Sequence, residues 1–318
     1  MSKKINNKVL ITVLVSLVII FLATNYFRKH NSKTSLKTDS IAIDTSQVSK
    51  ISIQKVAKGS DEIIFSKNSQ DWQVSQGTTS STVKSGNINT ILGQLKRFKI
   101  ERLVAKTKDK WIAYQLKDST ATKVIVEDNQ GGVTTIYLGK TKYNRPTNQY
   151  QQYKPSGSTY IRVNNDPKVY SVKGLLSNTF NRDFNSWRNS DFLKVDKNLV
   201  TKIQFDYLEE KSFALHKKDT VWNIEEVIAD STKVAQYLNT LSYKSNSKFA
   251  DNFIPKSKAD HTLRIEGNNM TEIIIEVYTD TISNKFYLKS TMNPQVFFES
   301  DSTGIFKQLF ISKDHFIE

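Results

Sequence analysis

The sequence predicts an α+β fold in which two tandem repeats follow a single N-terminal transmembrane helix. Each repeat should be a mostly antiparallel sheet with one or two helices. Three observations predict this architecture. An uncharged apolar run opens the 318-residue chain, short alternating strands with polar turns fill most of the remainder, and the same order of elements occurs twice.

The apolar run predicts a membrane anchor over residues 9–27. These residues carry no charge, and at about 1.5 Å per residue the helix would be about 28 Å long, which matches the hydrocarbon thickness of a bilayer. We expect residues 1–8 to form a cytoplasmic tail and residues 28–46 to form a polar tether.

A cleaved signal peptide is the alternative interpretation of this run. Cleavage after Ala23 would place Phe21 where a small residue is required, so an uncleaved signal anchor is favoured. Three lysines precede the run and four basic residues soon follow it, so the positive-inside rule hardly separates the two orientations. We expect a single-pass protein of the cytoplasmic (inner) membrane with its C-terminal region extracytoplasmic.

The first repeat is expected at residues 47–180 and the second at residues 198–318. Alternating strands begin at Val48 and at Val200, and a later strand in each repeat ends in a polar turn before a tryptophan. These tryptophans, Trp72 and Trp222, are 150 residues apart. The spacing indicates a repeat rather than the alternation that all β-rich chains share.

A helix is expected at the same place in each repeat. One apolar stripe comprises Ile88, Ile91, Leu92, Leu95 and Phe98, and the other comprises Val234, Tyr237, Leu238 and Leu241. Asn87 and Ser231 are the expected N-cap residues, because their side-chain oxygens can accept hydrogen bonds from first-turn amides.

The later elements correspond as well. Hairpins are expected over residues 123–139 and 262–278, strands at 160–163, 169–172, 286–289 and 296–298, short segments at 174–180 and 304–310, and closing segments at 190–193 and 313–316. The turns Asp128-Asn-Gln-Gly and Gly267-Asn-Asn contain residues that tolerate positive φ, as tight hairpins require. A shared order over about six elements is hard to obtain by chance.

Residues 181–197 should connect the two repeats. This segment combines aromatic, cationic and acidic side chains: Arg182, Asp183, Trp187, Arg188 and Asp191. We favour a packed hinge, in which the arginines pair with Asp183 or Asp191 and the aromatic rings join two cores. A partner-binding hot spot is the alternative, because tryptophan and arginine dominate binding energies at interfaces.

Several short motifs together resemble the DUF4340 family. They are Trp72-Gln-Val, Tyr114-Gln-Leu, Tyr137-Leu-Gly-Lys, Tyr160-Ile-Arg-Val, Val169-Tyr-Ser-Val and the run at 184–196. The resemblance covers nearly all of residues 48–318. It implies a membrane-anchored protein, associated with auxiliary subunits of ABC transporters of the gliding-motility type, and it carries over no catalytic residue. Gln115 stands where family members often have glycine, and Asn189-Ser190 replaces an Asp-Lys pair.

The composition argues against an enzyme. The absence of cysteine excludes thiol nucleophiles, disulfides and thiolate metal sites, and the four histidines have neither metal-ligand nor catalytic spacing. We therefore expect no catalytic residue, no metal and no cofactor.

The formal charge of +15 is concentrated in two segments. Residues 1–38 carry +7 and residues 84–173 carry +11, whereas the second repeat is nearly neutral. A basic cluster follows the first helix: Lys96, Arg97, Lys99, Arg102, Lys106, Lys108 and Lys110. Some of these lysines complement the helix macrodipole, but seven charges suggest contact with an anionic surface, either lipid headgroups or an acidic partner. No nucleic-acid-binding motif accompanies them.

The sequence therefore favours a non-enzymatic, membrane-anchored accessory or assembly protein. Its expected partners are the membrane and ABC-transporter subunits or other envelope proteins, with no role for nucleic acid. The alternative is a module that binds an envelope polysaccharide or another ligand on exposed aromatic rings, with Trp111, Tyr143, Tyr150, Tyr153 and Tyr160 as candidates. Ordinary strand packing would explain the same tyrosines.

Overall fold

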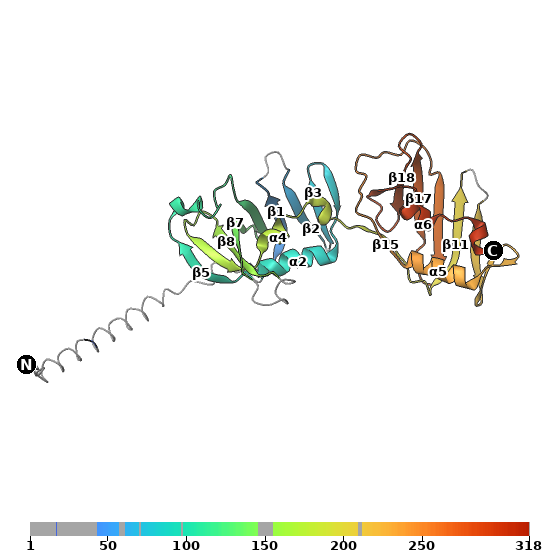
Figure 1. The fold of residues 1–318 in the computed structure, drawn as a ribbon, viewed down its shortest axis with the longest axis horizontal. Coiled ribbons are helices and arrows are strands. Elements are labelled where there is room, and N and C mark those ends of the chain that lie inside the picture. The colour runs from blue at the N-terminus through green and yellow to red at the C-terminus, as the bar shows by residue number, and fades with distance from the viewer. Residues whose placement is uncertain are drawn as a thin grey trace, which may run out of the picture. The chain divides into compact units, whose positions relative to one another are not determined.

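The computed structural model describes Leu17 and residues 43–56, 61–69, 71–96, 98–145, 155–208 and 212–317 (Figure 1). The fold is α+β and mostly β, with antiparallel sheets and few helices. Apart from Leu17, the predicted anchor at residues 9–27 lies outside the described residues, as do the predicted tail at residues 1–8 and most of the tether. Among the residues that are described, no helix combines the length and the apolar character needed to cross a membrane.

The first sheet has nine strands in the order β4-β3-β2-β1-β6-β7-β8-β9-β5. The strands are β1 (Val48–Gln54), β2 (Ile63–Asn68), β3 (Asp71–Gln76), β4 (Thr79–Thr82), β5 (Ile100–Ala105), β6 (Thr122–Asp128), β7 (Val133–Tyr143), β8 (Gly157–Val163) and β9 (Val169–Lys173). Apolar side chains alternate along them, so that Ile51, Ile53 and Phe65 are buried.

The second sheet has eight strands in the order β14-β13-β12-β11-β16-β17-β18-β19. The strands are β11 (Val200–Tyr207), β12 (Phe213–Lys218), β13 (Val221–Ile224), β14 (Val227–Ile228), β16 (His261–Gly267), β17 (Ile273–Asp280), β18 (Lys285–Ser290) and β19 (Phe297–Ser300). Two further strands, β10 (Asp191–Lys194) and β15 (Tyr243–Ser245), pair only with each other among the described strands.

The two long helices are α2 (Ser85–Lys96) and α5 (Ser231–Ser242), and each has twelve residues. All four predicted positions of the α5 stripe are buried, as are Ile88, Ile91 and Leu95 of α2. Shorter helical segments are η2 (Lys108–Trp111), α4 (Leu176–Phe180), η3 (Phe184–Ser186), α6 (Ile305–Leu309) and η4 (Lys313–Phe316). Helix α5 packs against β10, β13 and β15 and against α6 and η4 (Figure 1).

Both predicted N-caps are wrong. Helix α2 begins at Ser85, so Asn87 lies inside its first turn, where its side-chain amide donates to the carbonyls of Ser186 and Trp187. In α5 the cap is Asp230, whose carboxylate accepts from the amides of Thr232 and Lys233. The closing segments also differ, because residues 191–194 form a strand whereas residues 313–316 form a 3₁₀ helix.

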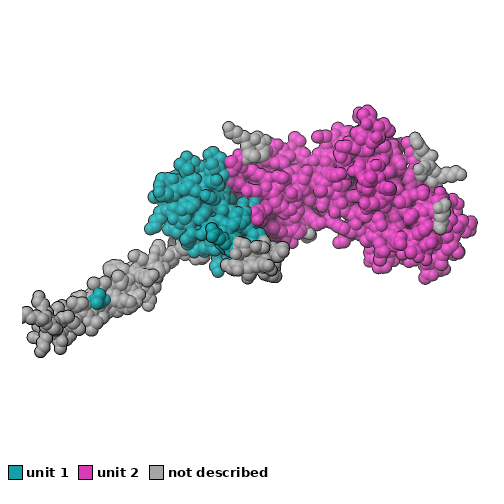
Figure 2. Space-filling view, viewed as in Figure 1, with its two compact units in different colours: residues 1–46, 93–121, 134–177 teal, residues 47–92, 122–133, 178–318 magenta. Residues whose placement is uncertain are grey.

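The described chain divides into two compact units (Figure 2). One contains residues 93–121 and 134–177, and its core includes Leu116, Tyr137 and Val169. The other contains residues 47–92, 122–133 and 178–318. Its largest apolar cluster extends from Phe192 to Phe316 and fills the space between the second sheet and α5.

Candidate functional site

The basic cluster is exposed where the structure describes it. Lys96 ends α2, Arg102 lies on β5, and Lys106, Lys108 and Lys110 lie in and before η2. The other members are Lys99, which is also exposed, and Arg97, which lies outside the described residues. The Lys110 ammonium contacts its neighbour Asp109 at 3.1 Å, and the Lys108 ammonium lies 5.4 Å from the ring centre of Trp111. The described cluster remains net positive, because Asp109 and Glu101 are the acidic residues within it.

The aromatic residues considered for a polysaccharide platform are separately engaged. The Trp111 indole donates to the Pro167 carbonyl at 3.0 Å, and the Tyr160 ring packs against Tyr114 at 4.6 Å between centres. Tyr143 is exposed, whereas Tyr150 and Tyr153 lie outside the described residues. Trp111 and Tyr160 therefore pack against the core of their unit.

A buried arginine explains why Trp111 is held in place. The Arg162 guanidinium lies 4.1 Å from the ring centre of Trp111 and 3.2 Å from that of Tyr137. It also donates to the Leu116 carbonyl at 2.9 Å and pairs with Asp118. A cation that is stacked on two rings and hydrogen-bonded through each of its three nitrogens is a structural element, which fixes the Trp111 ring rather than offering it to a ligand.

The connector is packed rather than exposed. Trp187 is fully buried, and its ring meets Phe65 edge-on at 5.4 Å between centres. The Arg182 guanidinium lies 4.4 Å from the Trp187 ring, and the Arg182 side chain also donates to the Ser186 carbonyl. Asp183, in contrast, is exposed and pairs with Lys55 at 3.0 Å.

Arg188 forms the strongest polar contact of the connector. Its side chain is 1% exposed and donates to both carboxylate oxygens of Asp251, at 2.6 and 2.7 Å. The guanidinium also lies 3.8 Å from the ring centre of Phe249. Bidentate pairing of this kind fixes orientation as well as distance. Arg188 thereby ties the connector to the segment at residues 246–257. The prediction that the arginines pair with Asp183 or Asp191 is wrong, because those carboxylates pair with Lys55 and Lys84 instead.

Asp191 joins a smaller polar cluster. It accepts from Lys84 at 2.8 Å and from the Tyr243 hydroxyl at 2.7 Å. Burial alone would raise the pKa of Asp191, but these two hydrogen bonds outweigh it and lower the pKa. The same hydrogen bonds, to Asp191 and to Tyr243, raise the pKa of Lys84. Both side chains are therefore held in their charged forms.

Two of the hollows beside the second sheet have aromatic walls. The first, which we call the aromatic groove, has a volume of about 720 Å³ and is lined mainly by residues 249–257 together with Tyr278, Ile282, Tyr287 and Glu299. Phe253 lines this groove and stacks on Tyr287 at 4.0 Å between ring centres. The second, which we call the apolar pocket, has a volume of about 570 Å³ and is lined by Tyr207, Phe286, Phe306 and Phe310 among others.

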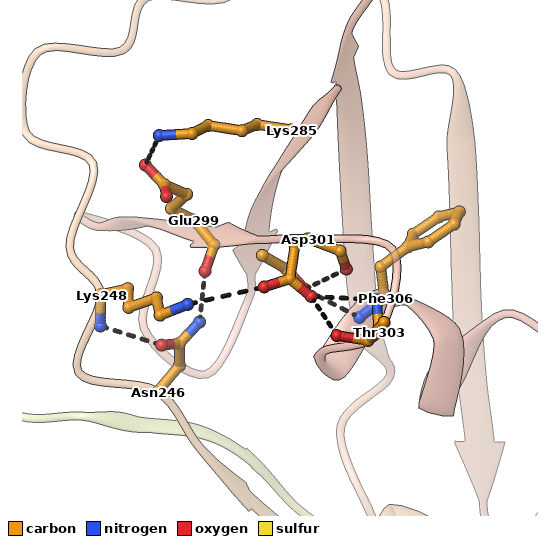
Figure 3. Close-up of polar contacts among 8 residues, drawn as sticks. Asn246, Lys248, Lys285, Glu299, Asp301, Thr303 and Phe306 are labelled. Carbon is orange, nitrogen blue, oxygen red and sulfur yellow. Dashed lines mark hydrogen bonds and ion pairs between the residues drawn. The ribbon is translucent and has the colours of Figure 1, made fainter. Parts of the chain in front are cut away.

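Residues 246–248, which we call the strap, lie beside β19 and support the wall of the aromatic groove. Asn246 donates to the Glu299 carbonyl and accepts from the Lys248 amide, each at 2.9 Å (Figure 3). The Glu299 side chain pairs with Lys285 at 3.0 Å. Because backbone and side-chain contacts cooperate, the strap keeps a fixed register on the sheet edge.

The adjoining turn supports the apolar pocket. Asp301 accepts from the Thr303 hydroxyl at 2.7 Å and pairs with Lys248 at 3.7 Å (Figure 3). The Phe306 amide donates to the buried Ser300 hydroxyl at 3.2 Å, and the Phe306 ring points away from these polar contacts. The turn thus sets the start of α6 and the position of the Phe306 ring.

Neither hollow could be predicted from the sequence. Asp251 is 63 residues from Arg188, and the aromatic residues of the groove are indistinguishable in the sequence from strand-packing residues. The only available signal was the density of Phe and Tyr after residue 249, which a local pattern cannot assign to one surface.

Comparison with family models matches residues 80–264 to DUF4340, a domain of unknown function. The match covers more than half of the 318 residues. The chain belongs to the DUF4340 family. No curated protein and no solved structure matches it.

The DUF4340 match includes the basic cluster, the connector and the Arg188–Asp251 pair. It also includes the residues 249–257 that wall the aromatic groove, whereas the strand residues Tyr278 and Tyr287 lie beyond it. Most residues that line the apolar pocket also lie beyond it. The DUF4340 region therefore contains the Arg188–Asp251 contact, whereas Glu299 and Lys285, which also support the groove wall, lie beyond it.

Proposed function

We propose that this chain is a non-enzymatic accessory or assembly protein that is anchored in the cytoplasmic membrane and binds a partner protein outside the cytoplasm. The family resemblance suggests a subunit of an ABC-type transporter as the partner. The observation that carries the proposal is the aromatic groove, whose lips present two isoleucines to solvent. Ile254 is 77% exposed and Ile282 is 96% exposed.

Exposed aliphatic side chains beside a concave aromatic surface are typical of a protein-binding site. Burying one isoleucine contributes about 1.5–3 kcal/mol, so the pair would supply a large share of the binding energy. The groove also presents Tyr278, Tyr287 and Phe253, residue types that are common at the centres of interfaces.

Site-specific crosslinking in native membranes tests this proposal. A photoreactive residue at position 254 or 282 should capture a transporter subunit, identified by mass spectrometry. The same residue at Ile228, which is 69% exposed on the edge strand β14, is the matched control. Equal capture from all three positions, or capture of polysaccharide only, would contradict the proposal.

The anchor and its orientation belong to the same proposal. It is supported by the uncharged residues 9–27 and by the family resemblance. Because the chain contains no cysteine, single cysteines can report topology without background. A cysteine in place of Ser302 should react with a membrane-impermeant maleimide in intact spheroplasts, whereas one in place of Ser2 should react only after lysis. Release of the protein by alkaline extraction would argue against an anchor.

We also propose that the two sheets are tandem repeats. The order β4-β3-β2-β1-β6 corresponds to β14-β13-β12-β11-β16, and a twelve-residue helix precedes β6 and β16 at equivalent places. The register shifts also correspond, between Val48 and Lys50 in one sheet and between Val200 and Lys202 in the other. An experimental structure in which these strands superpose in the same order would support the repeat, and a different strand order would contradict it.

The basic cluster is proposed to contact an anionic surface. Its support is the exposure of Lys106, Lys108 and Lys110, which have only Asp109 and Glu101 as acidic neighbours within the cluster. Lipid headgroups are the favoured surface, since the chain would be tethered to the bilayer.

A further inference from the structure

The apolar pocket is distinct from the aromatic groove, and among the described lining residues only Thr279 is shared. It lies where the ends of β11 and β17 and the starts of β16 and β18 approach α6 and the residues that follow it. Its volume of about 570 Å³ is within the range of small-molecule sites. The proposed partner binding does not use it.

The walls of the pocket are aromatic and aliphatic. Phe286 stacks on Phe306 at 3.8 Å between ring centres, and Phe306 stacks on Phe310 at 5.3 Å. Phe306 is therefore stacked between Phe286 and Phe310. Leu208 and Ile311 add aliphatic groups to this wall, and such an apolar wall suits an alkyl chain.

Hydrogen bonds within the chain hold the walls of the apolar pocket in place without a ligand. The Tyr207 hydroxyl donates to the Ile311 carbonyl at 2.7 Å, and the buried Tyr237 hydroxyl donates to the Leu309 carbonyl at 2.6 Å. The Ser300 hydroxyl accepts from the Phe306 amide, which fixes the start of α6 (Figure 3). A preformed apolar hollow loses little conformational entropy when it is filled.

The charge at the pocket restricts the head group of its ligand. Among the described residues that line the pocket, Asp260 is the acidic one, His261 and Tyr207 are the other ionisable side chains, and none is lysine or arginine. The Asp260 carboxylate also accepts from the Thr279 amide at 2.6 Å, which fixes its position. A carboxylate or phosphate head group would meet the Asp260 charge without a compensating cation.

From this geometry we propose that the apolar pocket binds the alkyl chain of an amphiphile whose head group is uncharged or cationic. The chain lies against Phe286, Phe306 and Phe310, and the head group lies near Asp260. Membrane lipids and soluble single-chain amphiphiles share this chemistry, and the probes below measure the single-chain form directly.

The test uses the full chain held in peptidiscs and three photoreactive dodecyl probes. Their head groups are a maltoside, a trimethylammonium and a carboxylate. The maltoside and ammonium probes should label peptides that contain Phe286 and Phe306–Phe310, and the carboxylate probe should label them roughly tenfold less. Shortening the chain by two methylene groups should weaken the apparent affinity by roughly fifteenfold. Labelling that ignores chain length, or that favours the carboxylate, would overturn the proposal.

Two variants provide the controls. Thr281→Trp fills the pocket from an exposed position and should abolish labelling, whereas Ile282→Trp places the same side chain at the neighbouring position on the aromatic groove and should leave labelling unchanged. Asp260→Asn should remove the preference for the ammonium over the carboxylate while the maltoside probe still binds. Circular dichroism checks that each variant is folded. Labelling that persists in a folded Thr281→Trp variant would overturn the proposal. Crosslinking of a protein, rather than of the probe, to these peptides would show that the pocket binds a peptide instead and would also overturn it.

Discussion

Arg188 is buried, and both of its carboxylate contacts come from Asp251. Replacement by methionine keeps much of the volume but leaves Asp251 without its cation. Breaking a buried pair costs about 3–5 kcal/mol, but the Asp251 side chain is 32% exposed and can be rehydrated, so we expect a loss of about 2 kcal/mol in the free energy of unfolding. Urea denaturation followed by circular dichroism measures it.

Arg182→Met is the matched control, because Arg182 stacks on Trp187 and donates to a backbone carbonyl without a carboxylate partner among its described contacts. It should cost less than about 1 kcal/mol. If the two variants are equally stable, the Arg188–Asp251 pair does not hold the connector.

Gln115 has a φ of +57°, in the left-handed region that glycine adopts without steric cost. The backbone conformation at this position therefore suits glycine better than glutamine. Gln115→Gly should therefore raise the free energy of unfolding by up to about 1 kcal/mol, since relief of strain exceeds the added flexibility of the unfolded chain. Thermal unfolding measures the change. Gln130→Gly is a control without positive φ and should not stabilise the chain.

The Lys84–Asp191 contact should make stability depend on pH at both extremes. Asp191 has a folded pKa below its ordinary value of 3.8, so its contribution is present above that value and is lost as the pH falls through the folded pKa. Lys84 has a folded pKa above 10.5, so its contribution is present below 10.5 and is lost as the pH rises through the folded pKa.

Asp191→Asn should remove the loss of stability that this contact causes at acid pH. The side chains of Lys84 and Asp191 are 41% and 33% exposed, so the difference between wild type and variant should stay below about 1 kcal/mol near neutral pH and vanish in acid. Urea unfolding at a series of pH values measures it. A difference that is unchanged between neutral pH and strong acid would show that the contact is not electrostatic.

At the scale of elements, the cap of α5 distinguishes the structure from the sequence prediction. Asp230 accepts from two first-turn amides, whereas Ser231 was the predicted cap. Asp230→Ala should lower the melting temperature by a few degrees, and Ser231→Ala should have little effect. The Asp230 pKa is lowered first by the hydrogen bond from the Lys233 amide, so the stabilisation should be lost as the pH falls through its folded pKa. The opposite ranking of the two variants would restore Ser231 as the cap.

Local periodicity predicted the elements well. The apolar stripes of α2 and α5 and the hairpin turns could be predicted because each depends on residues close in sequence: Gly131 and Asn269 do have positive φ. The predictions of the cap residues were wrong because a shift of the helix start by one or two residues makes a different polar residue the cap. These polar residues are equally plausible caps from the sequence alone. Residues 190–193 and 313–316 look alike, but β10 finds β15 as a pairing partner and η4 packs on α5 instead.

At the scale of the whole molecule, the distribution of charge could be predicted from the sequence, whereas the positions of the hollows could not. The excess of basic residues after α2 can be counted directly, and the described members are exposed. The hollows depend on pairs such as Phe253 with Tyr287 and Phe286 with Phe306, which come from different elements and have ordinary strand composition. The strand order decides which rings meet, and the alternation of apolar and polar residues does not specify that order.

The basic cluster yields a prediction for the chain reconstituted in vesicles. A fluorophore on a cysteine in place of the exposed Thr107 should be quenched by nitroxide-labelled headgroups when the vesicles contain phosphatidylglycerol. Each lysine near an anionic surface contributes about 1 kcal/mol, so Glu at positions 106, 108 and 110 should abolish most of the quenching.

Charge screening separates this attraction from simple proximity to the anchor. With a Debye length of about 3 Å at 1 M salt, wild-type quenching should fall toward that of the triple variant. The matched control replaces the exposed Lys217, Lys218 and Lys258 by Glu, which changes the net charge equally at another surface and should preserve quenching. Equal quenching in all three proteins at low salt would show that the cluster does not face the bilayer.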